Sequence, residues 1–384
     1  MRHTRPIGRS RERHFDGLRG IAALIVVFEH ISALLPVGNW TVGRGLTGSF
    51  TTSLANIPFR SGAFAVYVFF VISGVVIAQA AINKPWPLSL VSRYLRLTIP
   101  MLAASLMAWL LLRNFPYAMP TIRQFKDNHW TSEDYQTGPA SFLDAISEPI
   151  FRVYRSAAPT LNPVLWTMRM EMFGSLAILS FYRFVPARMR LAGAILIALA
   201  LAMSGHWRYL AFPLGAAIFE INARNPIGWR PAFGLWAIFL GLGLDVVGGM
   251  PQMHGSDLSM SRFFGVPVDL TSLIYTAGAA LTVVGVMANT DSKRILEMRI
   301  PQFLGRISYC LYLTHMPLLF TAFAALYLEL GHPPTPLWLV GWTLFFAVVA
   351  LAVAWWFTLW IDEPITRLVK VRKRRDAIEI APTL

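Results

Sequence analysis

The sequence predicts an all-α fold: a polytopic integral membrane protein of about ten transmembrane helices, with both termini in the cytoplasm. Of its 384 residues, 55% are hydrophobic and only 14% are charged, and the mean hydropathy is +0.51. A soluble protein of this length carries more charge and fewer long apolar runs. We therefore expect a multi-pass protein of the cell's inner (cytoplasmic) membrane.

Ten apolar segments are candidate transmembrane helices. A helix needs ~20 such residues to cross the hydrocarbon core of a bilayer. The fifth and sixth segments are short and are separated only by Gly205 and His206, so they form either one kinked hairpin or a partly re-entrant pair. The ten segments are 17–36, 62–82, 91–113, 164–182, 190–204, 207–222, 231–249, 271–288, 305–328 and 337–361.

The distribution of basic residues predicts the orientation. If the N-terminus is cytoplasmic, 24 of the 34 Lys and Arg residues fall on the cytoplasmic side, which is the bias typical of cytoplasmic loops. An even number of spans then returns the C-terminus to the same side. The formal charge of +14 is explained by this topology, so we expect no nucleic-acid partner.

The whole chain, 1–384, is expected to form a single membrane domain. Segment 114–163 is too polar to span, and we expect an extracytoplasmic loop that caps the outer mouth and contacts an acceptor. Segment 365–384 is predicted to be a basic cytoplasmic tail beside anionic membrane lipids. The basic N-terminus lacks a small-residue cleavage site, so we expect an uncleaved first span rather than a signal peptide. The single cysteine, Cys310, excludes an internal disulfide and a cysteine-built metal site, and no metal is expected.

The first span contains the strongest candidate site. A helix from residue 17 to 35 is about 28 Å long, which matches the hydrocarbon core. It carries Arg19 near one end and His30 deep inside. Eleven positions apart, the two share a helix face and lie about 16 Å apart along the axis. Polar groups inside a span are costly, so this face is interpreted as functional; a histidine merely hydrogen-bonded to a neighbouring helix is the alternative.

A second cationic site is predicted at the cytoplasmic start of the third span. Arg93 and Arg96 are three positions apart and share a helix face. Two guanidinium groups suit a phosphate-bearing ligand, because each makes bidentate, charge-assisted contacts. Topological anchoring is the competing interpretation. On the preceding span, the Ser73-Gly74 pair predicts close helix packing or a kink that lets substrate pass.

Other charged or titratable residues inside the predicted spans need partners. Arg169 and Glu171 point about 200° apart on one helix, so each requires a partner elsewhere or a watery cavity. His315 precedes a proline and is either catalytic or hydrogen-bonded at the proline kink. Asp362 and Glu363, where the last span meets the cytoplasm, are expected to form salt bridges with arginines.

Six stretches of the chain occur in the order of a known family. They are FDGLRGIAALIVVFEH, VYVFFVISG, SRYLRLTIP, LWTMRMEMF, GRISYCLYLTHMP and IDEPITRL. The ordered set runs from residue 15 to 368 and resembles membrane acyltransferase family 3, the integral-membrane acyltransferases that modify glycans and other hydroxyl-bearing molecules. The resemblance implies ten or more spans and an acyl-CoA donor, usually acetyl-CoA. It marks the first-span histidine, His30, as essential, and it implicates Arg19, Arg93 and Arg96.

The resemblance also implies a glutamate after the Leu-Trp motif, which corresponds to Glu171. Arg169 and Met172 depart from the family's pattern, which more often has a small residue and a second acidic residue at these positions. The last motif reads Asp-Glu-Pro, so the acidic residue carried over is Asp362. These departures affect the roles expected of Glu171 and Asp362 more than that of His30.

A mechanism follows from these positions as a hypothesis. The phosphates of acyl-CoA dock against the three arginines, and the pantetheine arm, comparable in length to the ~16 Å between Arg19 and His30, threads between helices. A neutral His30 takes the proton from a hydroxyl of a glycan or lipid-linked sugar acceptor. An acyl-imidazole on His30 is the alternative route. Glu171, on another span, is the candidate to orient His30.

Two rival classes stay open at this point. A secondary transporter of a glycan or lipid intermediate would use Glu29, His30 and Glu171 as a proton relay, although no repeat relates the two halves of the sequence. A structural scaffold would leave these residues replaceable. Binding of acyl-CoA by the detergent-solubilised protein distinguishes the enzyme from both.

Overall fold

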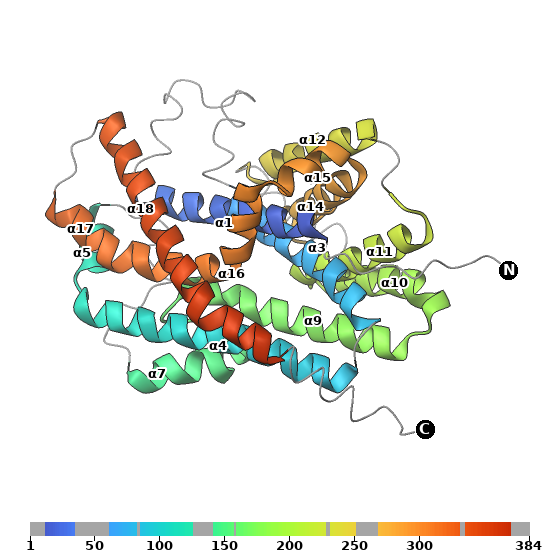
Figure 1. Cartoon of the computed structure of the whole chain (residues 1–384), viewed down its shortest axis with the longest axis horizontal. Coiled ribbons are helices and arrows are strands. Elements are labelled where there is room, and N and C mark those ends of the chain that lie inside the picture. The colour runs from blue at the N-terminus through green and yellow to red at the C-terminus, as the bar shows by residue number, and fades with distance from the viewer. Residues whose placement is uncertain are drawn as a thin grey trace.

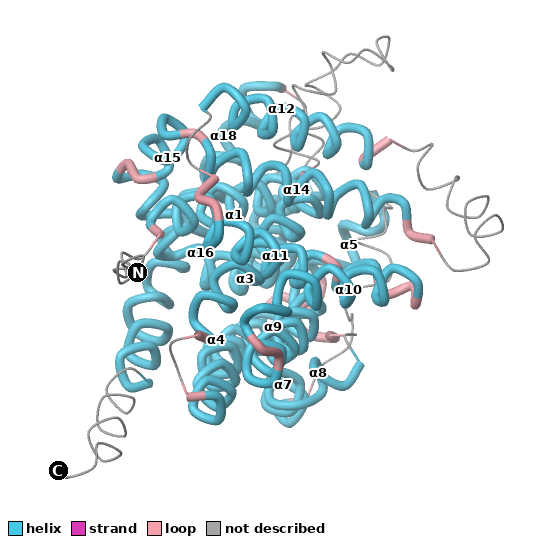
Figure 2. Tube along the Cα trace, turned by 90° about the vertical axis from the view of Figure 1, so that its right-hand side faces the viewer, coloured by secondary structure: helices cyan, strands magenta, loops and turns pink. Residues whose placement is uncertain are grey.

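The computed structural model describes residues 12–34, 61–82, 85–125, 141–156, 159–227, 231–250, 268–330 and 335–369. Within these ranges every regular element is a helix, as Figure 2 shows. The predicted all-α class is therefore confirmed for the part of the chain that is described. The N-terminal basic segment and most of the basic tail, from residue 370 onward, lie outside it.

All ten apolar segments expected from the sequence contain helix. The observed bounds differ from the expected ones by six residues at most, except that α16 ends ten residues early, at Leu318, where the chain continues through a π turn into a further short helix. The fifth and sixth segments are separate helices joined through Gly205, whose φ of 74° favours a residue without a side chain. The ten are α1 (Arg13–Leu34), α3 (Gly62–Ala81), α4 (Trp86–Asn114), α9 (Trp166–Phe184), α10 (Arg190–Met203), α11 (Ala211–Arg224), α12 (Pro231–Gly248), α14 (Leu270–Ala288), α16 (Arg299–Leu318) and α18 (Pro336–Phe357).

Six helical segments among the described residues are long and apolar enough to cross a membrane. At 22 residues, α1 is also long enough, about 33 Å, but Arg13, Asp16, Arg19 and Glu29 interrupt its apolar character. At 14 residues each, α10 and α11 reach only about 21 Å. The six segments, which indicate a multi-pass membrane protein, are Gly62–Ala81, Trp86–Asn114, Pro163–Phe184, Leu270–Ala288, Arg299–Glu329 and Leu337–Val369.

Pairs of closely packed helices build the interior of the bundle. In the first pair α1 lies along α16, in the second α3 lies along α11, and in the third α12 lies along α14. Figure 1 shows α1 and α3 between the layer formed by α4 and α9 and the layer formed by α12 and α14. Most buried apolar side chains form one core that extends across these helices, and a smaller second cluster contains Ala108, Ala145 and Leu161.

Glycines let two of these pairs meet backbone to backbone. A Cβ atom on Gly305 of α16 would collide with the carbonyl oxygen of Asp16 on α1. Where α3 meets α11, a Cβ on Gly74 or on Gly215 would collide with a backbone carbonyl of the partner helix. Small residues allow such close approach in membrane helices. The packing role predicted for the Ser73-Gly74 pair is confirmed for Gly74.

The described part of segment 114–163 contains helical elements that run back along α4. Phe142 packs against Trp109, near the end of α4, with ring centroids 5.3 Å apart. Tyr94, near the start of α4, donates a 2.9 Å hydrogen bond to the carbonyl oxygen of Ile150. The segment therefore covers much of the length of α4, while its place outside the membrane stays a prediction. Its elements are α5 (Ala118–Phe125), α7 (Phe142–Ser147), the π turn η3 (Glu148–Arg152) and α8 (Val153–Ser156).

Two further π turns extend helices that border the interior. After Pro317, α16 continues into η7 (Leu319–Phe323) and then α17 (Ala324–Glu329). At the end of α18, the turn η8 (Thr358–Asp362) carries Asp362. Proline removes one backbone donor from a helix, and π turns are frequent at functional sites.

The glycine contacts predict a position-dependent response to an added methyl group. Gly305→Ala should destabilise the protein by about 1–3 kcal/mol, because the helices must separate to admit the methyl group. Gly341→Ala in α18 is the matched control, since no neighbouring atom lies within 4 Å of its added Cβ. The change from glycine to alanine by itself stabilises a helix. Thermal unfolding in detergent measures both variants. Equal unfolding temperatures for the two would contradict the packing described here.

Candidate active site

Two histidines from distant parts of the chain meet inside the bundle. His30 on α1 and His315 on α16 are both buried, and Nδ1 of His30 lies 2.8 Å from Nε2 of His315. Their rings are stacked, with centroids 5.0 Å apart. The close packing of α1 against α16 brings the two residues together although 285 positions separate them in the sequence.

The hydrogen bonds of this histidine pair indicate which nitrogen carries each proton. Nδ1 of His315 lies 2.9 Å from the carbonyl oxygen of Leu311, which can only accept, so this nitrogen donates. In a neutral His315 the other nitrogen, Nε2, then accepts, and Nδ1 of His30 is its donor. The lone pair of a neutral His30 is therefore on Nε2. This is the atom through which His30 can accept a proton.

A cavity of about 170 Å³ lies inside the bundle among α1, α3, α4, α9 and α16. Its charged lining residues are three guanidinium groups and two carboxylates, which give a net charge of +1 if all are ionised. A cleft with positive net charge attracts anionic ligands. The charged lining residues are Arg19, Arg93, Arg96, Glu171 and Asp362.

An ion pair between Arg93 on α4 and Glu171 on α9 lies on the wall of this cavity. Ser73 of α3 donates a 2.6 Å hydrogen bond to Oε1 of Glu171. Nε of Arg93 donates a 2.9 Å hydrogen bond to the hydroxyl of Ser175. The side chains of Arg93 and Glu171 are only 22% and 12% exposed. Three helices thus meet in one polar group, the Arg93–Glu171 cluster, formed by Ser73, Arg93, Glu171 and Ser175.

The other two predicted cations lie close to this cluster. Arg19 interacts electrostatically with Glu171 and Asp16, which attract it, and with Arg93 and Arg96, which repel it. The charge of Arg96 in turn acts on Asp362 at the end of η8. The structure therefore brings the three arginines together around one cavity. Their role toward a donor stays a prediction.

The histidine pair lies beyond the cavity rather than on its wall. Tyr312 lines the cavity, and its ring centroid is 6.0 Å from that of His315. The hydroxyl of Tyr312 lies 2.9 Å from that of Thr167 on α9. Along the continuous helix α1, Arg19 and His30 are about 16 Å apart. Tyr312 therefore lies between the wall of the cavity and the histidine pair.

The sequence identified the charged members of the site but not the contacts among them. Glu171 was expected to orient His30; the hydrogen bonds shown for it come from Arg93 and Ser73, and His315 is hydrogen-bonded to His30 instead. Uncharged residues such as Ser175 gave no signal, because serine is ordinary in an apolar helix. His315 was conspicuous as a second histidine, but nothing local in the sequence links it to His30.

The remaining polar residues of the predicted spans have different surroundings. Glu363 accepts hydrogen bonds of 2.6 Å from Arg306 and 2.9 Å from Arg367, so the salt bridges expected for it are confirmed. Asp362 lines the cavity. The guanidinium carbon of Arg169 lies 5.9 Å from the centre of an aromatic ring on its own helix, a cation–π arrangement.

The helix bundle, the interior cationic cavity and the buried histidine pair define an integral-membrane protein with an interior polar site. The chain belongs to the acyltransferase-domain family, whose sequence profile matches residues 13–361. It is similar to acyltransferase clz18 of Cochliobolus lunatus, with 22% identity over 446 residues and coverage of 93% of this chain and 94% of that protein. No solved structure gives a significant match. Family membership and this relative support an enzyme that transfers acyl groups.

The Arg93–Glu171 cluster predicts strong energetic coupling between its two charged members. Arg93→Met and Glu171→Gln should each destabilise the protein, because each leaves the partner's charge shielded from water. The double variant should lose about 1–3 kcal/mol less than the sum of the two single losses. Equilibrium unfolding in mixed detergent micelles measures this cycle.

A second cycle, on the exposed pair Arg294 and Asp291, is the control. Their side chains are 80% and 74% exposed, and water screens such pairs, so their coupling should be close to zero. Equal coupling in the two cycles would mean that Arg93 and Glu171 are solvated and do not hold the helices together.

Proposed function

We propose that this protein transfers an acyl group, with acetyl as the expected one, from acyl-CoA to a hydroxyl group of a glycan or lipid-linked sugar. The observation that carries the proposal is a histidine pair with a defined accepting nitrogen beyond a cationic cavity. Membership of the acyltransferase family supports acyl transfer itself. The donor, the acceptor and the roles of individual residues form the proposal.

The phosphates of the donor are assigned to Arg19, Arg93 and Arg96. Arg93 is already paired with Glu171, so a phosphate competes with a carboxylate for this guanidinium. The net positive charge of the cavity favours the phosphate, and guanidinium groups bind phosphate bidentately. The pantetheine arm then extends past Tyr312 toward the histidine pair.

His30 is assigned as the general base. Its Nε2 takes the proton of the acceptor hydroxyl while the hydroxyl oxygen attacks the thioester carbonyl carbon. The carbon–sulfur bond then breaks, the new ester forms, and the proton on His30 passes to the departing thiolate to give free CoA. His315 accepts a hydrogen bond from Nδ1 of His30, which stabilises the protonated ring during the reaction. Attack by Nε2 itself, through an acyl-imidazole, is the alternative path.

The proposal places the ten apolar helices across the inner membrane with both termini in the cytoplasm. The excess of basic residues on one side supports this orientation. Arg93 and Arg96 then lie near the cytoplasmic side, where acyl-CoA is available. His30 lies closer to the opposite side, where an extracytoplasmic acceptor would approach.

Reporter fusions test this topology. A reporter that is active only in the cytoplasm should function at the C-terminal tail and fail at Asp134, within the predicted extracytoplasmic segment. A reporter active only outside should give the opposite pattern. If the reporters place the C-terminal tail and Asp134 on the same side of the membrane, the ten-span arrangement is refuted.

Replacing His30 provides the sharpest test of the chemistry. His30→Gln should reduce acyl transfer by about 10²–10⁴ in rate, because an amide hydrogen-bonds but does not accept a proton near pH 7. The measurement is the mass increment of one acyl group on surface glycans, together with acyl-CoA binding by the purified protein. Binding should persist, because His30 lies about 16 Å from Arg19.

His206→Gln is the matched control, because this histidine is exposed and bonds only to the nearby Ser204 among the contacts shown for it. It should leave both readouts unchanged. Near-normal transfer by His30→Gln at normal expression would make His30 a structural residue. Absence of acyl-CoA binding by the unmodified protein would refute the donor and the function together.

A further inference from the structure

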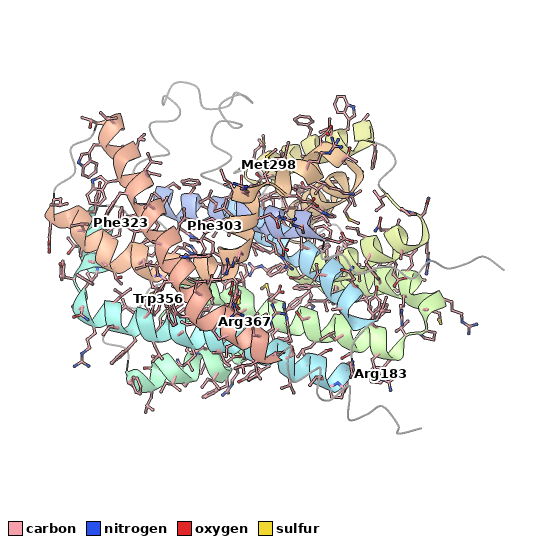
Figure 3. All side chains as sticks on the ribbon, in the orientation of Figure 1. Arg183, Met298, Phe303, Phe323, Trp356 and Arg367 are labelled. Carbon is pink, nitrogen blue, oxygen red and sulfur yellow. The ribbon has the colours of Figure 1, made fainter. Side chains whose placement is uncertain are left out.

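A second cavity, the end cavity, opens where α4 begins and where α3 and α9 end. Its volume is about 310 Å³, within the range of small-molecule sites. Figure 3 shows Arg183 at this end of the bundle. The residues that line it are Ala81, Ile82, Pro85, Trp86, Ser89, Leu179, Tyr182, Arg183 and Arg190.

The end cavity lies along the same helices as the interior cavity. The same three helices, α3, α4 and α9, line both, and the residues involved follow one another at steps of four positions, which keep side chains near one face of a helix. The separation is eight residues along α3 and α9, about 12 Å, and four residues along α4, about 6 Å. The corresponding residues, interior cavity first, are Ser73 and Ala81 on α3, Arg93 and Ser89 on α4, and Glu171 and Leu179 on α9.

The described residues that line the end cavity carry donors and positive charge but no carboxylate. The indole Nε1 of Trp86 is buried and has no hydrogen-bond partner there. A buried donor without a partner costs free energy, which a bound acceptor would restore. Arg183 and Arg190 add two positive charges, and no acidic residue is among the lining residues.

Part of this arrangement supports the fold. Arg190 donates 3.3 Å hydrogen bonds to the carbonyl oxygens of Val185 and Tyr182, and its guanidinium lies 4.8 Å from the centre of the Tyr182 ring. These bonds use two of its five N–H donors. A carboxylate on α11, Glu220, accepts from the Tyr182 hydroxyl and pairs with Arg224, so its charge is already matched. The end cavity therefore keeps a positive balance suited to phosphate.

We propose that the end cavity binds the 3′-phosphoadenosine end of the CoA donor. Arg183 and Arg190 contact the 3′-phosphate, and the Trp86 indole donates to a phosphate or ribose oxygen. The diphosphate lies about 6–12 Å deeper, at the arginines of the interior cavity. CoA carries its phosphates in two separate groups, and the two cavities offer two separate cationic sites along the same helices. This inference rests on the proposed function, because it requires acyl-CoA as donor.

The test compares CoA with dephospho-CoA, which lacks only the 3′-phosphate. Binding is measured on the full-length protein in nanodiscs of phosphatidylcholine. The unmodified protein should bind CoA about tenfold more tightly, the value of one charge-assisted contact. Arg183→Ala and Arg190→Ala should each remove most of this preference while leaving dephospho-CoA affinity unchanged. Trp86→Phe should weaken CoA binding severalfold, because it keeps a ring and removes the donor.

Arg188→Ala is the matched control. Arg188 carries the same charge two positions before Arg190, and it does not line the end cavity. Its preference for CoA should equal that of the unmodified protein. Unchanged dephospho-CoA affinity shows that a variant is folded.

Three results would overturn the proposal. One is an equal affinity of the unmodified protein for CoA and dephospho-CoA. Another is a normal preference in both arginine variants. The third is that the variants change only the interaction with phosphatidylglycerol in the nanodiscs and not the binding of CoA, which would identify a lipid headgroup site. In each of these cases CoA still binds, so the proposed function survives; failure of the unmodified protein to bind either compound refutes the function as well.

Discussion

A charged side chain inside an apolar bundle must have a partner, and the ion pair between Arg93 and Glu171 meets this requirement where α3, α4 and α9 converge. Removing such charges from water is expensive, and the two serines of the cluster offset part of the cost with hydrogen bonds. Because the pair is tied to three helices, it fixes one wall of the interior cavity.

The second buried contact, between His30 and His315, fixes the direction of hydrogen bonds rather than pairing opposite charges. The carbonyl oxygen of Leu311 can only accept, so Nδ1 of His315 donates to it. The proton positions on Nε2 of His315 and on His30 follow from this bond. The base of the proposed reaction is therefore oriented by a second imidazole and not by a carboxylate. This arrangement leaves Glu171 available to hold Arg93 in place.

Helices were predictable from the sequence because apolar runs bounded by proline, glycine and charge have few alternatives; α9 and α14 end within two residues of their expected bounds. The helical elements inside segment 114–163 were not predicted, since helices as short as α7 depend on packing against α4. Within the site, charge made Arg19, Arg93, Arg96 and Glu171 recognisable. Their pairing was not predictable, because it depends on how helices far apart in sequence dock, and local patterns carry no information on that.

Tyr312 and Thr167 have a consequence for the membrane itself. A polar groove that reaches this far between helices threatens to conduct protons and so to discharge the membrane potential. The two hydroxyl oxygens lie 2.9 Å apart, and the carbonyl oxygen of Val164 lies 3.2 Å from that of Tyr312 and 2.9 Å from that of Thr167. The two hydroxyl protons satisfy two of these three contacts. Because the hydroxyl protons are already engaged in this way, a chain of water molecules would find few free donors here. In the proposed reaction, the contact that the thioester displaces is thus also an insulating seal, broken only while a substrate fills the gap.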